Sequence, residues 1–124
     1  APQLVKPAIE SRLVSQIDLA PTILGLMNLN YTSRFFCFFL YNMTPGNERA
    51  FISTYQDMGY VKDGKLVILS PQQKVQQFKP DFTTGANVQM AGSAELINEA
   101  IAWYQGASFQ YKTGRYKSVK QVKP

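Results

Sequence analysis

The fold is decided by residues 50–80, which read AFISTYQDMGYVKDGKLVILSPQQKVQQFKP. Aromatic and β-branched residues, which favour strands, concentrate in runs at residues 51–55, 60–61, 66–69 and 75–78. Asp63-Gly64 separates two of these runs. This dipeptide indicates a type I′ turn, because such a turn needs a positive φ at both central residues and Asp-Gly is a favoured pair there. We therefore predict a small antiparallel sheet of about three to four strands.

A helix is predicted on the N-terminal side of this sheet, at about residues 15–28. Four apolar residues recur there at the helical period and form one face, which we expect to point into the core. They are Leu19, Ile23, Leu26 and Met27. Asp18 is a suitable N-cap, and Ser15 with Asp18 offers a capping-box-like start one turn earlier. Residues 31–49 indicate a packed crossover and a turn-rich loop, to which we assign no chemistry.

A second helix is predicted on the C-terminal side of the sheet, with Ser93 as its N-cap. Glu95 stands in its first turn, where a negative charge interacts favourably with the helix dipole. The inward stripe of this helix comprises Ile97, Ala100, Ile101 and Tyr104. The chain is therefore expected to have an α+β fold in which this helix lies across the sheet.

Three parts of the chain follow from these elements. Residues 1–49 carry the first helix and the loop, residues 50–111 form an antiparallel-sheet-plus-helix subdomain, and residues 112–124 form a basic tail. At 124 residues the chain is large enough for one folded unit and too short for two ordinary domains.

The residue types present exclude histidine- and zinc-centred catalysis by this chain alone. The sequence has no histidine and one cysteine, whereas a zinc site needs several Cys or His ligands at short spacing. Cys37 lies in the apolar run FFCFFL, so we interpret it as a buried or half-buried hydrophobic residue and not as a nucleophile. Glycine-rich phosphate-binding strings do not occur in the sequence.

Oxygen-ligand cation sites are also not indicated. Asp57 and Asp63 stand six positions apart on hairpin arms, and Glu95 and Glu99 lie on one helix face that we expect to be solvated. We therefore identify no catalytic, cofactor-binding or metal-binding residue in this chain.

The positive charge is concentrated at the C-terminal end. The net charge is +5, and the tail carries Lys112, Arg115, Lys117, Lys120 and Lys123 without an acidic residue, which leaves the rest of the chain neutral. A basic tail of this kind is either a solvated terminus or a contact to an anionic lipid or polymer.

Nucleic-acid binding is disfavoured by the neutral body of the chain. Phe51, Tyr55 and Tyr60 could stack on bases beside a basic groove, but we assign these rings to the core or to helix packing instead. The apolar run at residues 35–40 is far shorter than the roughly 20 residues that span a bilayer, so no transmembrane segment is expected in this chain.

Residues 14–26 read VSQIDLAPTILGL and resemble the S-x-I-D-L-x-P-T-L-L-x-L-x-G segment of the sulfatase and lipoteichoic-acid-synthase branch of the alkaline phosphatase superfamily. Further similar strings follow in the order of membrane-anchored phosphoglycerol-transferase-like members, at residues 28–31, 35–36, 49–52, 59–60, 63–65 and 68–69. The resemblance extends to about residue 116. Cys37-Phe38-Phe39 departs from the family, which shows a glycine and a small or acidic residue there.

The resemblance implies that residues 1–49 are the C-terminal edge of an α/β sulfatase-like domain. In this family a large α/β domain binds one or two divalent cations (Mn, Mg, Ca or Zn) and transfers or hydrolyses phosphate or sulfate esters outside the cytoplasm. The ligands and the nucleophile would lie upstream of this chain. Cys37 is not followed by the C-x-P-x-R pattern of formylglycine sulfatases, so no family site residue is carried over.

Two functional hypotheses remain open at this point. In the first, the chain is the C-terminal fragment of a metal-dependent sulfatase or of a phosphoglycerol- or phosphoethanolamine-type transferase, and its partner is the upstream catalytic domain. The resemblance then implies a periplasmic or cell-surface location and a membrane-anchored parent. In the second, the chain is a self-standing, non-catalytic α+β module that binds an anionic partner.

Overall fold

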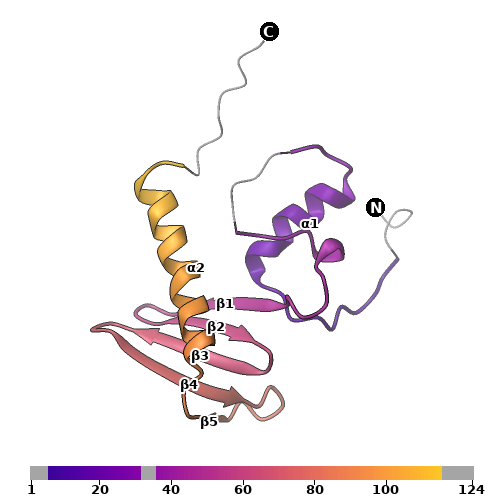
Figure 1. Ribbon diagram of the computed structural model, residues 1–124. Coiled ribbons are helices and arrows are strands. Elements are labelled where there is room, and N and C mark those ends of the chain that lie inside the picture. The colour runs from indigo at the N-terminus through magenta and orange to yellow at the C-terminus, as the bar shows by residue number, and fades with distance from the viewer. Residues whose placement is uncertain (1–5, 32–35, 116–124) are drawn as a thin grey trace.

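The computed structural model describes residues 6–31 and 36–115 (Figure 1). A five-stranded antiparallel sheet carries a long C-terminal helix on one face, and the short N-terminal helices lie beside its first strand. The predicted α+β class is confirmed. Lys117, Lys120 and Lys123 of the predicted tail, and Phe35, lie outside the described residues.

The sheet is an uninterrupted meander in which each strand pairs with the next, in the order β1-β2-β3-β4-β5. Its strands are β1 (Arg49–Ser53), β2 (Met58–Lys62), β3 (Lys65–Ser70), β4 (Lys74–Pro80) and β5 (Asn87–Gln89). This is one strand more than predicted. The extra strand, β5, is three exposed residues long, so it carries no hydrophobic alternation that could indicate a strand.

Two tight turns set the register of the central strands. Asp63 and Gly64 have φ values of 50° and 68°, which confirms the predicted two-residue turn between β2 and β3. The connection between β3 and β4 is one residue longer, because Ser70 pairs with Lys74, and Gln72 and Gln73 within it have φ values of 62° and 61°. Glutamine is not a typical residue for this conformation, so the sequence indicated a turn there but not its type.

The long helix α2 (Ala94–Lys112) is anchored at its start by a side chain of the sheet. Ser93 is the N-cap as predicted, but its hydroxyl makes no capping hydrogen bond. Instead the buried side-chain amide of Gln77 makes two hydrogen bonds to the backbone of Ser93. Ser93 N donates to Gln77 Oε1 at 2.6 Å, and Gln77 Nε2 donates to Ser93 O at 3.0 Å. This pair of bonds fixes the helix start on β4.

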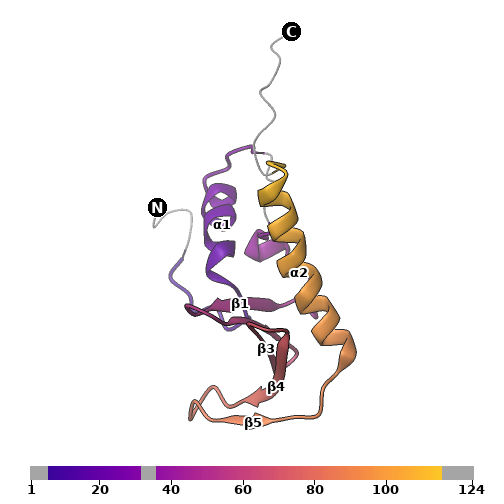
Figure 2. The ribbon, with the colours of Figure 1, turned by 90° about the vertical axis from the view of Figure 1, so that its left-hand side faces the viewer.

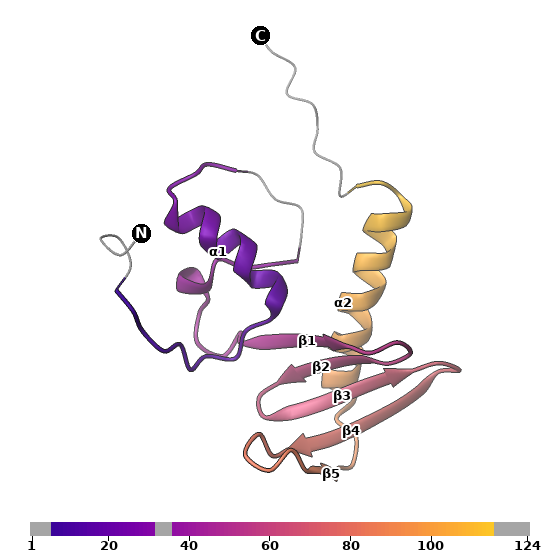
Figure 3. The same cartoon turned by 180° about the vertical axis from the view of Figure 1, so that it is seen from behind.

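The core lies between α2 and one face of the sheet (Figure 2). Its buried centre consists of Tyr60, Val67, Leu96 and Ala100. Strand register places Arg49, Phe51, Tyr60, Lys62 and Val67 on this same face, because side chains alternate along each strand. Figure 3 shows the other face, over which none of the described helices lies.

The N-terminal segment forms a short 3₁₀ turn η1 (Gln16–Asp18), the helix α1 (Leu19–Leu26) and, after the crossover, a second 3₁₀ turn η2 (Leu40–Asn42). The helix predicted at residues 15–28 is therefore present but divided and shorter. No described helix is long and apolar enough to cross a membrane.

The predicted inward face of α1 is wrong for the chain as it stands. Leu19, Ile23 and Met27 are 59%, 47% and 61% exposed, whereas Pro21 and Thr22 are buried. The helix thus contacts the rest of the chain through its polar and small residues. The apolar period was read correctly, but no described segment of the chain covers the face that it defines.

Candidate binding pocket around Arg49

The site begins with a buried ion pair that joins the N-terminal segment to the sheet. Arg49 Nη1 lies 2.9 Å from Asp18 Oδ2, and both side chains are only 2% exposed. The Asp18 carboxylate also accepts hydrogen bonds from the backbone N–H groups of Ser15 and Phe38, at 3.1 and 2.8 Å. Asp18 therefore caps η1, as the Ser15–Asp18 spacing predicted, but its carboxylate makes no cap bond to α1.

The Arg49 guanidinium is enclosed by aromatic rings. It lies 4.5 Å from the ring centroid of Phe38, 5.0 Å from that of Phe51 and 5.5 Å from that of Trp103. Arg49 Nη2 donates to the backbone carbonyl of Phe36 at 2.7 Å, while the buried Nε has no hydrogen-bond partner among the described residues. The ring faces compensate part of the lost hydration of this cation.

A second ion pair lies next to the first. Lys62 Nζ is 2.8 Å from Glu99 Oε1 and 3.1 Å from Oε2, and the Tyr60 hydroxyl donates to Glu99 Oε1 at 2.7 Å. The expectation that Glu99 is simply solvated is wrong, because its side chain reaches from α2 across to β2. Burial and the hydrogen bond to Glu99 both raise the pKa of Tyr60 well above its ordinary value. Burial acts to raise the pKa of Glu99, but its bonds to Lys62 and Tyr60 together lower it.

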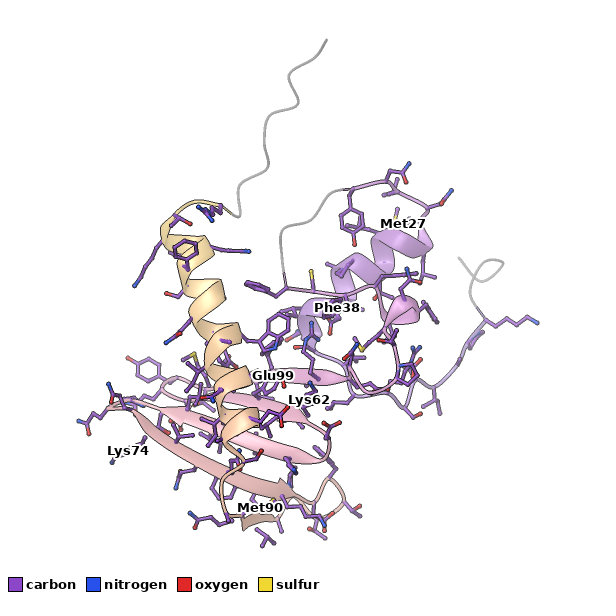
Figure 4. All side chains as sticks on the ribbon, viewed as in Figure 1. Met27, Phe38, Lys62, Lys74, Met90 and Glu99 are labelled. Carbon is purple, nitrogen blue, oxygen red and sulfur yellow. The ribbon has the colours of Figure 1, made fainter. Side chains whose placement is uncertain are left out.

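These groups surround a pocket of about 250 Å³. The crossover and loop contribute Phe38, Asn42, Met43, Thr44 and Asn47; the sheet contributes Arg49, Tyr60 and Lys62; and α2 contributes Glu99 and Trp103. Figure 4 shows Lys62 and Glu99 next to each other beside α2, with Phe38 on the side of α1. The pocket thus lies where the N-terminal segment meets the sheet and the helix.

The other acidic pairs considered in the sequence do not assemble into a site. Asp57 precedes β2, whereas Asp63 lies in the turn at the far end of that strand. Among residues 6–31 and 36–115, no three His, Cys, Asp or Glu side chains are grouped so that they could hold a metal ion. Cys37 is half-buried, as predicted. The pocket therefore offers hydrogen bonds, charge and aromatic surface, which suit binding.

The three strand aromatics that the sequence assigned to the core or to helix packing do not all lie there. Phe51 and Tyr60 pack in the core, which confirms the assignment made for them. Tyr55 is 98% exposed in the turn after β1 and packs on neither the sheet nor the helix.

The sequence interpretation missed the pocket because its residues come from a loop and from one strand face. Arg49 lies two positions before Phe51 in β1, and Lys62 lies two positions after Tyr60 in β2. The strand period of two could therefore have placed both cations on the helix-covered face with these rings. Asn42 and Asn47 carry no such signal, because their position depends on how the crossover folds over the sheet.

Comparison with known proteins gives one informative likeness. No protein-family model matches the chain, and none of the curated proteins matches it. Among solved structures, the chain is similar to the crystal structure of a protein in the alkaline phosphatase superfamily from Vibrio parahaemolyticus. The two are 27% identical with a TM-score of 0.86, and the likeness covers 93% of this chain and 28% of the Vibrio chain.

This likeness supports the alkaline phosphatase superfamily, which is the class that the residue string at 14–26 indicated. It extends over nearly the whole of this chain, including the sheet, α2 and the N-terminal segment. The chain spans about 28% of the length of the Vibrio protein, so it is similar to a part of that protein.

Proposed function

We propose that the chain is the C-terminal portion of a metal-dependent enzyme that acts on sulfate or phosphate esters, either a sulfatase or a phosphoglycerol- or phosphoethanolamine-type transferase. The observation that carries this proposal is the likeness to a superfamily protein, with a TM-score of 0.86 over 93% of this chain. In this proposal the chain does not itself contain the catalytic site.

The motif residues of the first helix support this assignment through their structural roles. The Asp18 carboxylate accepts a hydrogen bond from the Arg49 guanidinium. The Thr22 hydroxyl donates to the backbone carbonyl of Asp18 at 2.7 Å and accepts from the backbone N–H of Leu40 at 3.1 Å. Pro21 is buried. These residues tie the helix to the crossover and to β1, so the string is accounted for by folding, without any catalytic role.

The exposed face of α1 supports an upstream catalytic domain as the partner. Leu19, Ile23 and Met27 form an apolar strip on this helix, and a groove of about 230 Å³ beside it is lined by Val14, Leu19 and Leu40 among others. A contiguous apolar patch of this kind marks a surface that another body covers. We assign this surface to the α/β domain that the sequence resemblance implies, because the α1 string belongs to that domain in the family.

The divalent metal of the proposed enzyme does not fit the residues described in this chain, since they offer no group of three or more ligand side chains. Its ligands therefore belong to the catalytic domain in this proposal.

The same resemblance leads us to propose a periplasmic or cell-surface location. Contact of the basic tail with an anionic lipid or polymer is a further part of the proposal, in which Lys112 and Arg115 are the described cations.

The test compares the natural gene product with the 124-residue chain. Both are assayed for hydrolysis of p-nitrophenyl sulfate and of bis(p-nitrophenyl) phosphate, with Mn²⁺, Mg²⁺, Ca²⁺ or Zn²⁺ and after chelation. The natural product should hydrolyse one ester in a chelator-sensitive manner, and the 124-residue chain should hydrolyse neither. Ester hydrolysis by the short chain alone would overturn the proposal.

A further inference from the structure

We propose that the pocket around Arg49 binds one hydroxylated ring or short polyol that carries no net charge. The claim goes beyond the proposed function, because it concerns binding by this chain and needs no catalytic domain.

The aromatic wall of the pocket provides an apolar platform. One side of the Phe38 ring covers the Arg49 guanidinium at 4.5 Å, and the ring is still 44% exposed. Trp103 lines the same pocket from α2 and is only partly buried. The C–H face of a sugar or polyol ring packs on such aromatic surfaces, while its hydroxyl groups remain free for hydrogen bonds.

The polar wall places a donor and an acceptor side by side. The Lys62 ammonium has three N–H donors and makes two bonds to Glu99, so one donor remains. The Glu99 carboxylate has about four lone-pair sites; Tyr60 and Lys62 use three of them, and the Trp103 side chain is a further hydrogen-bonding neighbour of this carboxylate. This arrangement suits hydroxyl groups on neighbouring carbons. The Asn42 amide on the loop wall makes no hydrogen bond to the described residues and adds a further donor and acceptor.

The charge balance of the pocket selects against a free anion. Arg49 is neutralised by Asp18, and Lys62 is neutralised by Glu99. A bare sulfate or phosphate would have to displace one of these carboxylates from its partner. The volume of about 250 Å³ lies just below the range of about 300–1,000 Å³ that drug-sized ligands occupy, which limits the ligand to one small ring.

Trp103 provides the readout, because it is the only tryptophan in the sequence and lines the pocket. The 124-residue chain is titrated with D-glucose, with glycerol and, at constant ionic strength, with sodium sulfate, while its fluorescence is recorded. We expect a saturable change with D-glucose or glycerol and a Kd on the order of 1 mM, as befits a small ligand. Sodium sulfate should produce no saturable change.

Variants of both walls connect the signal to the pocket. Phe38→Ala should weaken binding roughly tenfold and Asn42→Ala a few-fold, because they remove the platform and one polar contact respectively. Tyr55→Ala is the control, since this ring is 98% exposed and does not line the pocket. The unfolding midpoint of each variant verifies that it is folded, and Phe38 and Asn42 are both exposed enough to be replaced.

Two results would overturn the inference. One is the absence of saturable binding of either hydroxylated probe to the folded chain, and the other is saturation by sulfate in place of them. Neither result bears on ester hydrolysis by the natural gene product, so this inference and the proposed function can fail separately.

Discussion

At the scale of single residues, the Asp18–Arg49 pair holds the N-terminal segment on the sheet. Both charges are buried, and the carboxylate accepts bonds from two backbone N–H groups as well as from the guanidinium. Removing one partner of such a pair leaves an uncompensated buried charge, which is more costly than the pair is stabilising. The spacing of Ser15 and Asp18 indicated a cap, but the partner 31 positions along the chain depended on the tertiary fold.

Asp18→Asn should therefore lower the free energy of unfolding by about 3–5 kcal/mol, measured by urea denaturation. Glu10→Gln is the matched control, because it breaks the exposed ion pair between Glu10 and Arg12 and should change the midpoint little. Equal midpoints for both variants would contradict the role given to Asp18.

The second residue-scale prediction concerns pH. The folded-state pKa of Glu99 is lowered below its ordinary 4.5, so the carboxylate stabilises the fold above that pH. This stability is lost as the pH falls through the folded-state pKa. Between about pH 6 and about pH 3, the native chain should lose more stability than the Glu99→Gln variant.

Glu95→Gln provides the control for this measurement. It removes the same charge from the same helix without removing a hydrogen bond to Lys62 or Tyr60. If Glu99→Gln and the native chain gave the same pH dependence in urea denaturation, the hydrogen bonds of Glu99 would contribute nothing to the free energy of unfolding.

At the scale of elements, two helical glycines have opposite surroundings. A Cβ on Gly25 of α1 would stand 2.6 Å from the Phe39 ring, whereas one on Gly106 of α2 would meet Phe36 at 3.5 Å, an ordinary contact. Gly106→Ala should therefore stabilise the chain by up to about 1 kcal/mol, the propensity gain of alanine in a helix. Gly25→Ala should destabilise it by about 1–3 kcal/mol through overpacking. Thermal unfolding of the two variants checks the sign of each change, and stabilisation by Gly25→Ala would refute the close packing of α1 on the crossover.

The turn between β3 and β4 allows a further prediction. Gln73 has a φ of 61°, a region that is costly for residues with a side chain and free of strain for glycine. Gln73→Gly should raise the free energy of unfolding by about 0.5–1 kcal/mol, as measured in urea. Gly64→Ala in the preceding turn, where φ is 68° with open space around the Cα, should lower it by a similar amount. A destabilised Gln73→Gly variant would contradict the turn geometry.

How much the sequence predicts differs between elements. The Asp63-Gly64 hairpin was predictable, and so were Ile97 and Ala100 of the inward stripe of α2, because turn chemistry and helical period are local properties; the buried Leu96 was missed. Strand β5 was not, since it is held by pairing to β4 and has exposed side chains. The pocket was not predictable either, because it brings together a loop, a strand face and a helix that are distant in sequence.

At the scale of the whole molecule, the outward apolar face of α1 is the feature that the chain by itself leaves unexplained. Because Ile23 and Met27 are 47% and 61% exposed and lie outside the core cluster, the double change to serine should alter the free energy of unfolding of this chain by no more than about 1 kcal/mol. In the natural gene product the same change should lower stability markedly if, as proposed, the catalytic domain covers this face. Comparable sensitivity in both proteins would remove the argument for a covering domain.

The most direct test of the central claim is the sequence of the gene upstream of the codon for Ala1. We predict an uninterrupted reading frame that encodes a large α/β domain with a nucleophile and Asp and His metal ligands. A stop codon followed by a start codon next to Ala1 would contradict it and would favour a self-standing binding module.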